Sequence, residues 1–219
     1  MEGRGLPAAV LAAASDRRGG ALEVAATALD GLLEVADEPP LLERSVAALL
    51  AGQPAMAPIW HLAQAARVPD PRSALAALRR RLAADADAAV AAATTWLQAR
   101  LAATPGAVAT VSHSSLADRV LAHIALTSAD PVVGLVGADA IGPGALLNAV
   151  GTRELVGRVP TLVVATAVKL VPAEVLGRLG GEGFEVVPLE AVAAVVVGAE
   201  VLSPADAGRR AQELSRARP

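Results

Sequence analysis

The chain has 219 residues, of which 54% are hydrophobic and 19% charged, so it has ample material for a core and is not intrinsically disordered. Aromatic residues make up only 1% and the net charge is -3, which excludes both the stacking platforms and the basic field of a nucleic-acid-binding protein. Because the chain has no cysteine and only three histidines, we expect no disulfide, no metal and no cofactor.

The hydropathy pattern predicts no membrane-spanning segment. A spanning helix needs about 20 consecutive apolar residues, and no window of that length here is free of charged or turn-forming residues. The first residues lack the uninterrupted apolar core of a secretory signal. All basic residues except Lys169 are arginine, and alanine is abundant, which is typical of GC-rich bacterial coding. We therefore expect a cytoplasmic bacterial protein that binds neither a membrane nor nucleic acid.

The residues before Pro105 have the pattern of a helical unit. Leucine and alanine recur at helical spacing, arginine and glutamate fall on the polar faces, and β-branched clusters are few. Pro58 is predicted in the first turn of one helix, and Ser73 is predicted to cap another. The predicted helices cover residues 22–33, 41–51, 58–67 and 74–103.

After Gly106, short β-branched runs alternate with helical stretches, which is typical of a parallel sheet with crossover helices. The predicted strands are 108–111, 132–136, 161–165 and 185–187, and the predicted helices between them are 115–126, 145–156 and 173–179. The predicted fold class is therefore α/β. An N-terminal helical domain, residues 1–105, lies beside a compact Rossmann-like parallel-sheet domain, residues 106–219.

Polar side chains follow the predicted strands. Ser114 follows the first strand, Asp139 the second and Lys169 the third. Since ligands of parallel sheets bind at the carboxyl ends of the strands, these groups suit a small phosphorylated or hydroxylated ligand. A structural interpretation stands beside this one, because a carboxylate after a strand commonly caps a helix. Asp139 is then expected to cap the helix after Gly144 or to pair with Lys169.

The segment Gly137–Ile141, followed by Gly144–Thr152, resembles the signature of the initiation factor 2B α/β/δ and sugar-phosphate isomerase superfamily. Further segments resemble that family's motifs in the same order, and together they span nearly the whole chain. These segments are Asp16–Ala26, Gln53–Pro58, Val111–Ser115, Lys169–Pro172, Phe184–Glu190 and Val201–Pro204.

The resemblance implies a site and also shows where this chain departs from the family. Isomerases of the superfamily use a cysteine and an aspartate as an acid/base pair. Asp139 matches the aspartate, whereas Ser114 stands at the cysteine position and Gln53 replaces an arginine that binds phosphate. Asp139 is therefore the candidate catalytic residue. The ligand-binding residues carried over from the motifs are Ser114, Asn148, Gly151, Thr152 and Lys169.

The chain is also shorter than the family pattern between Ser114 and Asp139. The family inserts a strand, a helix, a strand and a helix there, and one crossover unit alone takes about 30 residues. This segment has room for only one helix and one strand. We therefore expect a smaller sheet and a ligand pocket that lacks part of its usual wall.

These departures favour a non-catalytic, initiation factor 2B-like binding or assembly protein. Moving a proton between adjacent sugar carbons needs two acid/base groups, and an isolated serine hydroxyl serves poorly near neutral pH. One alternative is a sugar-phosphate isomerase of the ribose-1,5-bisphosphate type that has re-sited its acid. Another is a translation initiation factor subunit, which the bacterial composition disfavours. The sequence leaves open whether the protein is an enzyme.

Four other residues have a structural and a functional interpretation each. His113 either shuttles protons or, as we favour, holds the strand-end loop by hydrogen bonds. Asn148, the only asparagine, contacts either the ligand or solvent on a helix surface. Trp60 and Trp96 are expected to pack between helices rather than to form a ligand cage.

A homodimer through the C-terminal domain is implied by the resemblance. The apolar run Ala191–Val197 adds an argument, since a large exposed apolar patch commonly marks a contact between subunits. The competing interpretation is that this run is an interior strand, because buried parallel strands have the same composition.

Overall fold

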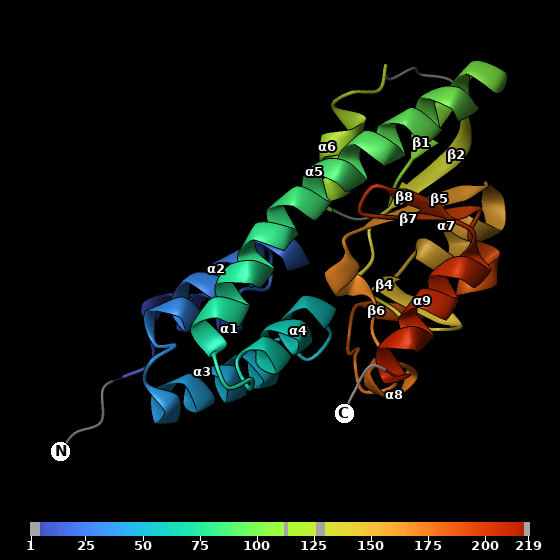
Figure 1. Cartoon of the computed structure of the whole chain (residues 1–219). Helices are drawn as coiled ribbons and strands as arrows, with labels where there is room; N and C mark the ends of the chain where they lie inside the picture. The colour runs from blue at the N-terminus through green and yellow to red at the C-terminus, as the bar shows by residue number, and fades with distance from the viewer. Residues whose placement is uncertain (1–4, 112–113, 126–129, 217–219) are drawn as a thin grey trace.

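The computed structural model describes residues 5–111, 114–125 and 130–216. A helical unit and an α/β unit lie side by side, and one long helix, α5 (Pro71–Ala103), runs along both (Figure 1). Leu75 and Leu78 of α5 pack in the helical core, whereas its residues from Ala86 to Leu97 pack on the sheet. The two units therefore share a rigid element, and the boundary near residue 105 stays a prediction.

The helical unit confirms the four helices expected from the leucine and alanine spacing. Within the described residues it consists of α1 (Ala8–Ser15), α2 (Ala21–Glu34), α3 (Pro39–Gly52), α4 (Ala57–Ala65) and α5. Helix α1 was not predicted, because its sequence is apolar all round and reveals no period. It packs closely on α2 at Gly31, where an added Cβ would lie 2.7 Å from Val10 Cγ2.

The long helix begins earlier than its predicted cap. Pro71 occupies its first turn, and the carboxylate of Asp70 accepts a hydrogen bond from the backbone N–H of Ser73 at 3.1 Å. Asp70 is therefore the N-cap, and the prediction for Ser73 was wrong. Both residues suit the role chemically, but a proline is favoured at the first helical position, directly after the cap.

The α/β unit is built on a five-stranded sheet in the order β1-β2-β5-β7-β8, in which only β8 is antiparallel to its neighbour. The strands are β1 (Ala107–Ala109), β2 (Pro131–Val136), β5 (Thr161–Ala165), β7 (Ala194–Val197) and β8 (Glu200–Leu202). Helices α5 and α6 (Ser115–Leu121) cover one face, and α7 (Thr152–Arg158) and α9 (Pro204–Arg216) cover the other. The predicted α/β class with a parallel sheet beside a helical unit is confirmed.

A second, antiparallel sheet corrects two predictions. It contains β3 (Ala140–Ile141), β4 (Ala145–Ala149) and β6 (Phe184–Pro188) in that order. The predicted strand at 185–187 therefore belongs to this sheet and not to the parallel one. The helix predicted over 145–156 is wrong: β4 comes first, Gly151 turns the chain at φ +100°, and α7 follows. The pairing of β4 with β6 overrides the helical propensity of the alanines and leucines of β4.

The apolar run 191–197 ends in an interior strand. Its core is β7, whose residues are all buried between β5 and β8. The argument from this run for a dimer interface was therefore wrong, because helices of the same chain already cover both faces of β7. The remaining described elements are η1 (Ala167–Lys169), α8 (Ala173–Leu176) and η2 (Leu189–Ala191). Helices α6 and α8 are both shorter than the predicted helices 115–126 and 173–179.

Candidate functional site

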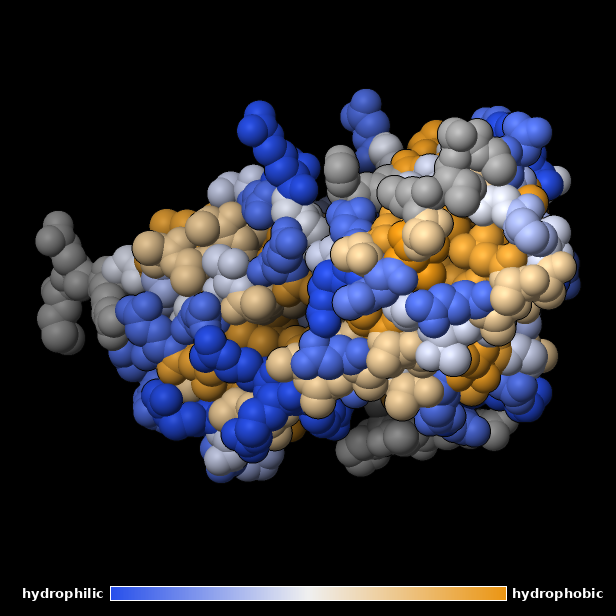
Figure 2. All heavy atoms as spheres, turned by 90° about the horizontal axis from the view of Figure 1, so that it is seen from above, coloured by the Kyte–Doolittle hydropathy of each residue, from blue (hydrophilic) through white to orange (hydrophobic). Residues whose placement is uncertain are grey.

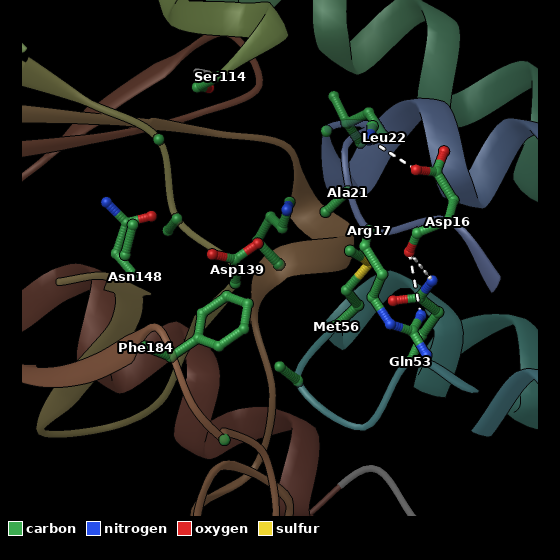
Figure 3. Close-up of a pocket in the computed structure, with 18 of the residues that line it drawn as sticks. Asp16, Arg17, Ala21, Leu22, Gln53, Met56, Ser114, Asp139, Asn148 and Phe184 are labelled. Carbon is green, nitrogen blue, oxygen red and sulfur yellow. Dashed lines mark hydrogen bonds between the residues drawn. The ribbon is translucent and has the colours of Figure 1, made fainter. Parts of the chain in front are cut away.

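A cavity of about 560 Å³ lies where the helical unit meets the carboxyl ends of β2 and β5 (Figure 3). One wall comes from the loop after α1, the first turn of α2 and the turn between α3 and α4. The other comes from the start of α6, the loop after β2, strand β4, η1 and the segment before β6. Segments far apart in the sequence therefore build a single cavity.

Four of the six predicted site residues line this cavity: Ser114, Asp139, Asn148 and Lys169. Gly151 and Thr152 lie outside its lining. His113 falls outside the described residues. The sequence reasoning missed the contribution of Asp16, Arg17, Met56 and Phe184, which Figure 3 places around the cavity.

Lys169 is the buried cation of the cavity. It ends the 3-10 turn η1 directly after β5 and is only 5% exposed. Burial lowers the pKa of its amine, and the nearby charge of Asp139 opposes that shift. Among the described residues, no carboxylate oxygen lies within 4 Å of the amine, so its charge has no ion-pair partner. Such a group gains most from an anionic ligand.

Asp139 is held by its backbone, which leaves its carboxyl to the cavity. Its N–H donates to the carbonyl of Leu147 at 2.9 Å, and its own carbonyl accepts from the N–H of Ala57 on α4 at 3.2 Å. Burial raises the pKa of the carboxyl, and the positive charge of Lys169 opposes that shift. Asp139 and Lys169 therefore interact electrostatically without direct contact. The capping interpretation was wrong, because a strand follows Gly144.

Ser114 is the N-cap of α6. Its hydroxyl accepts a hydrogen bond from the N–H of Ala117 at 3.4 Å. The strand end of β2 approaches it closely at Gly137, where an added Cβ would lie 2.5 Å from Ser114 Oγ. The glycine of the Gly137–Asp139 segment thus allows β2 to reach the cavity beside α6.

Asn148 lies on β4 with its side chain in the cavity lining (Figure 3). Its amide donates to Thr152 Oγ1 at 2.9 Å, and that hydroxyl donates to the carbonyl of Ala149 at 2.7 Å. Gly151 makes this arrangement accessible, because its φ of +100° turns the chain from β4 into α7. Gly151 and Thr152 therefore orient Asn148 instead of lining the cavity.

Two side chains of the helical wall donate to the protein's own backbone. Gln53 Nε2 donates to the carbonyls of Ala13 and Asp16, both at 2.7 Å. Arg17 likewise donates to the carbonyls of Ala14 and Asp16. The amide of Gln53 therefore holds the loop after α1 in place and does not serve as a donor to an anion.

The first turn of α2 supplies unpaired backbone donors to the same wall. Ala21 and Leu22 line the cavity, and the preceding N–H of Gly20 is held by Glu23 Oε2 at 3.2 Å. The first N–H groups of a helix have no partner within the helix, and the helix dipole places partial positive charge there. Among the described lining residues, this end of α2, the guanidinium of Arg17 and the amine of Lys169 are therefore electropositive, and the carboxylate of Asp16 lies on the same wall as the first two.

Within the described part of the chain, no three histidine, aspartate or glutamate side chains are grouped closely enough to hold a metal ion. No described helix combines the length and apolar character needed to cross a membrane.

Comparison with known proteins identifies the fold. No protein-family model matches the sequence, and no curated protein matches it. Among solved structures, the translation initiation factor eIF-2B of Pyrococcus horikoshii superposes with a TM-score of 0.70 at 15% identity, covering 90% of this chain and 96% of that one. The eIF2B beta subunit of Chaetomium thermophilum gives 0.64 at 13%, covering 93% and 88%. The 5-methylthioribose 1-phosphate isomerase of P. horikoshii gives 0.55 at 12%, covering 96% and 87%.

The chain therefore has the fold of these eIF2B proteins and of this isomerase, which is the fold that the motif resemblance implied. These similarities extend over nearly the full length of both chains. At such low identities they establish the fold alone.

Proposed function

We propose that the protein binds a small phosphorylated metabolite in the cavity between its two units and does not convert it. The phosphate lies between the amine of Lys169 and the first turn of α2, and the hydroxyl groups of the ligand face Asn148 and Asp139. A ligand held in this way contacts both units at once and stabilises their arrangement.

The observation that carries this proposal is the environment of Lys169. Only 5% of the residue is exposed, it lines the cavity, and its amine has no ion-pair partner among the described residues. A phosphate oxygen supplies the missing acceptor and a charge-assisted hydrogen bond. The N-terminus of α2 adds a second, weaker attraction for the same anion.

The residue at the position of the superfamily's second acid/base group supports binding over catalysis, because Ser114 stands there. Aldose–ketose isomerisation needs a group to remove a proton from one carbon and a group to protonate the neighbouring position. Asp139 suits one role, but the hydroxyl of Ser114 caps α6 and has no base beside it in the described structure. Gln53 is engaged with two backbone carbonyls and contributes no positive charge.

The competing function is a sugar-phosphate isomerase. It is favoured by one observation: burial raises the pKa of Asp139, so that this carboxyl exchanges protons closer to neutral pH than an exposed one. An isomerase would turn over ribose 1,5-bisphosphate or methylthioribose 1-phosphate, whereas a binding protein would not.

We further propose that the protein is cytoplasmic and pairs as a homodimer through its α/β unit. One of the similar solved structures is titled a tetrameric eIF2B beta/delta complex, so assembly is compatible with this fold. Figure 2 supports the α/β side, because hydrophobic residues gather on that half of the face it shows, whereas hydrophilic ones dominate much of the helical half. The alternative is that the protein assembles as a subunit of a translation initiation factor.

Calorimetric titration with ribose 5-phosphate tests the binding proposal. We expect saturable binding that Lys169→Met weakens about 10- to 100-fold, because a hydrogen bond to a charged group contributes about 1.5–3 kcal/mol. Arg80→Met, which removes an exposed positive charge from α5, is the matched control and leaves the Kd unchanged. Equal binding by wild type and Lys169→Met, or binding of ribose as tightly as of its phosphate, overturns the proposal.

A further inference from the structure

The 3-10 turn η1, which carries Lys169, is not capped by the residue at its N-cap position. Thr166 precedes η1 with the extended backbone of an N-cap residue, at φ -95° and ψ 163°, but its side chain makes no capping hydrogen bond. Its hydroxyl oxygen is buried without a hydrogen-bond partner in the described structure. The first N–H of the turn therefore needs an acceptor from elsewhere in the protein.

Asp85 on α5 supplies that acceptor. Its Oδ2 accepts a hydrogen bond from the N–H of Ala167 at 3.3 Å, across 82 positions of sequence. The carboxylate reaches this point beside Gly198, which follows β7 at φ +57°; an added Cβ there would lie 3.7 Å from Asp85 Oδ1. A carboxylate at the start of a helical turn is favourable both as an acceptor and through the dipole.

The other end of the turn is also held by the helical unit. His61 on α4 lies 2.8 Å from the carbonyl of Leu170, and since a carbonyl only accepts, Nε2 carries the proton. Between these two contacts, Val168 packs in the hydrophobic core of the helical unit. The three residues Ala167, Val168 and Leu170 thus hold the segment around Lys169 against helices from the other half of the chain.

We propose that Asp85 is a positioning residue, which caps the Lys169 turn and thereby places the Lys169 amine in the ligand cavity; the inference rests on the function proposed above. The amine stands at the end of a single 3-10 turn, so its position follows the start of that turn. The helical unit accordingly contributes to the site twice, through the wall at α2 and through the placement of the cation on the opposite wall.

Lys169 is the only lysine of the chain, which makes the test direct. Protein labelled with 13C,15N-lysine gives one side-chain NMR signal, and its titration reports the pKa of this amine without any ligand. In wild type we expect a pKa below that of a free lysine, because the amine is buried. Asp85→Ala releases the turn, hydrates the amine and moves its pKa upward toward the ordinary value.

Three further variants separate positioning from charge. Asp85→Asn keeps an acceptor for Ala167 N–H and leaves the Lys169 signal close to wild type, whereas Asp85→Glu keeps the charge but displaces the acceptor and moves the signal. Asp87→Ala is the matched control, since Asp87 lies two residues along α5 in an exposed pair with Arg119, and it has no effect. If Asp85→Ala does not fold, Asp85→Asn and Asp85→Glu carry the same comparison.

Two results would overturn the inference. One is a lowered pKa in both Asp85→Ala and Asp85→Asn, as expected from simple loss of a negative charge. The other is an unchanged signal in Asp85→Ala and Asp85→Glu.

In calorimetry with ribose 5-phosphate, Asp85→Ala is expected to raise the Kd about tenfold, which corresponds to about 1.4 kcal/mol. If wild type binds no sugar phosphate, the proposed function fails while the lysine titration still decides the role of Asp85.

Discussion

The choice of residue at individual positions decides what this cavity attracts. Gln53 and Arg17 both carry donors that suit an anion, yet each donates to backbone carbonyls of the loop after α1. Lys169 has no such partner in the described structure and remains available. The sequence predicted the positions of Ser114, Asp139 and Lys169 at strand ends, but it gives no means of telling an engaged donor from a free one.

The buried carboxyl of Asp139 predicts a pH-dependent effect on stability. Burial raises its pKa in the folded protein, and Lys169 opposes the shift only in part. A group with a raised folded pKa stabilises the fold fully below its unfolded pKa, about 3.9, and loses that contribution as the pH rises through the folded pKa. Asp139→Asn, which does not ionise, is therefore expected to have a higher free energy of unfolding than wild type at pH 7.

Urea unfolding at a series of pH values checks this expectation. The gain of Asp139→Asn over wild type should shrink as the pH falls and disappear at about pH 3 and below, where the Asp139 carboxyl of wild type is protonated in both the folded and the unfolded state. Asp87→Asn is the control, because its side chain is 76% exposed and its contact with Arg119 is a surface pair. A gain that persists undiminished at pH 3 would contradict the electrostatic explanation.

At the scale of elements, the sequence predicted best where one local signal had no competitor. The valine-rich strand β5 was predicted with its observed bounds, and α5 was recognised from its length and spacing. Strand β4 was taken for a helix, because alanine and leucine favour helices locally and the pairing with β6 lies more than thirty positions away, at Asn148↔Glu185. Long-range pairing of this kind leaves no mark in a local pattern.

Alanine substitutions of two glycines, at the start of α7 and inside it, are expected to have opposite effects on stability. Gly151→Ala places a side chain at φ +100° and is expected to destabilise the protein by about 1 kcal/mol or more, and to disturb the contact between Asn148 and Thr152. Gly157→Ala lies inside α7 with nothing within 4 Å of the new Cβ, and should stabilise by about 0.5–1 kcal/mol. Thermal unfolding of both variants measures the contrast, and equal effects would be evidence against the assigned turn.

The buried position of strand β7 predicts that a charged substitution in it prevents folding and does not merely dissociate a dimer. Val195 is fully buried between β5 and β8, so Val195→Asp places an unpaired charge in the core and is expected to prevent folding. Val201→Asp on β8, where the native side chain is 46% exposed, is the matched control and should fold. Circular dichroism and light scattering distinguish the outcomes, and a folded monomeric Val195→Asp would restore this run as a subunit interface.

At the scale of the whole molecule, the cavity belongs to neither unit alone. Its walls join the loop after α1 and the turn after α3 to segments that follow β2 and β5, and these segments meet only through the packing of both units along α5. The motif resemblance predicted the fold, and four of the six residues it indicated line the cavity at the sheet edge. In the helical half, the resemblance pointed only to Gln53, and the contributions of Asp16, Arg17 and Met56 were not predicted, since they depend on how the helical segments are placed against the sheet.

The central claim is that this cavity holds a sugar phosphate without converting it. The most direct test is phosphorus-31 NMR of ribose 1,5-bisphosphate and of methylthioribose 1-phosphate, each incubated with an excess of protein. We predict shifted or broadened signals of the bound ligand and no new phosphorus signal over several hours. New signals of the corresponding ketose phosphates, absent with Asp139→Asn, would contradict the claim and establish an isomerase; signals unchanged by the protein would contradict the binding site itself.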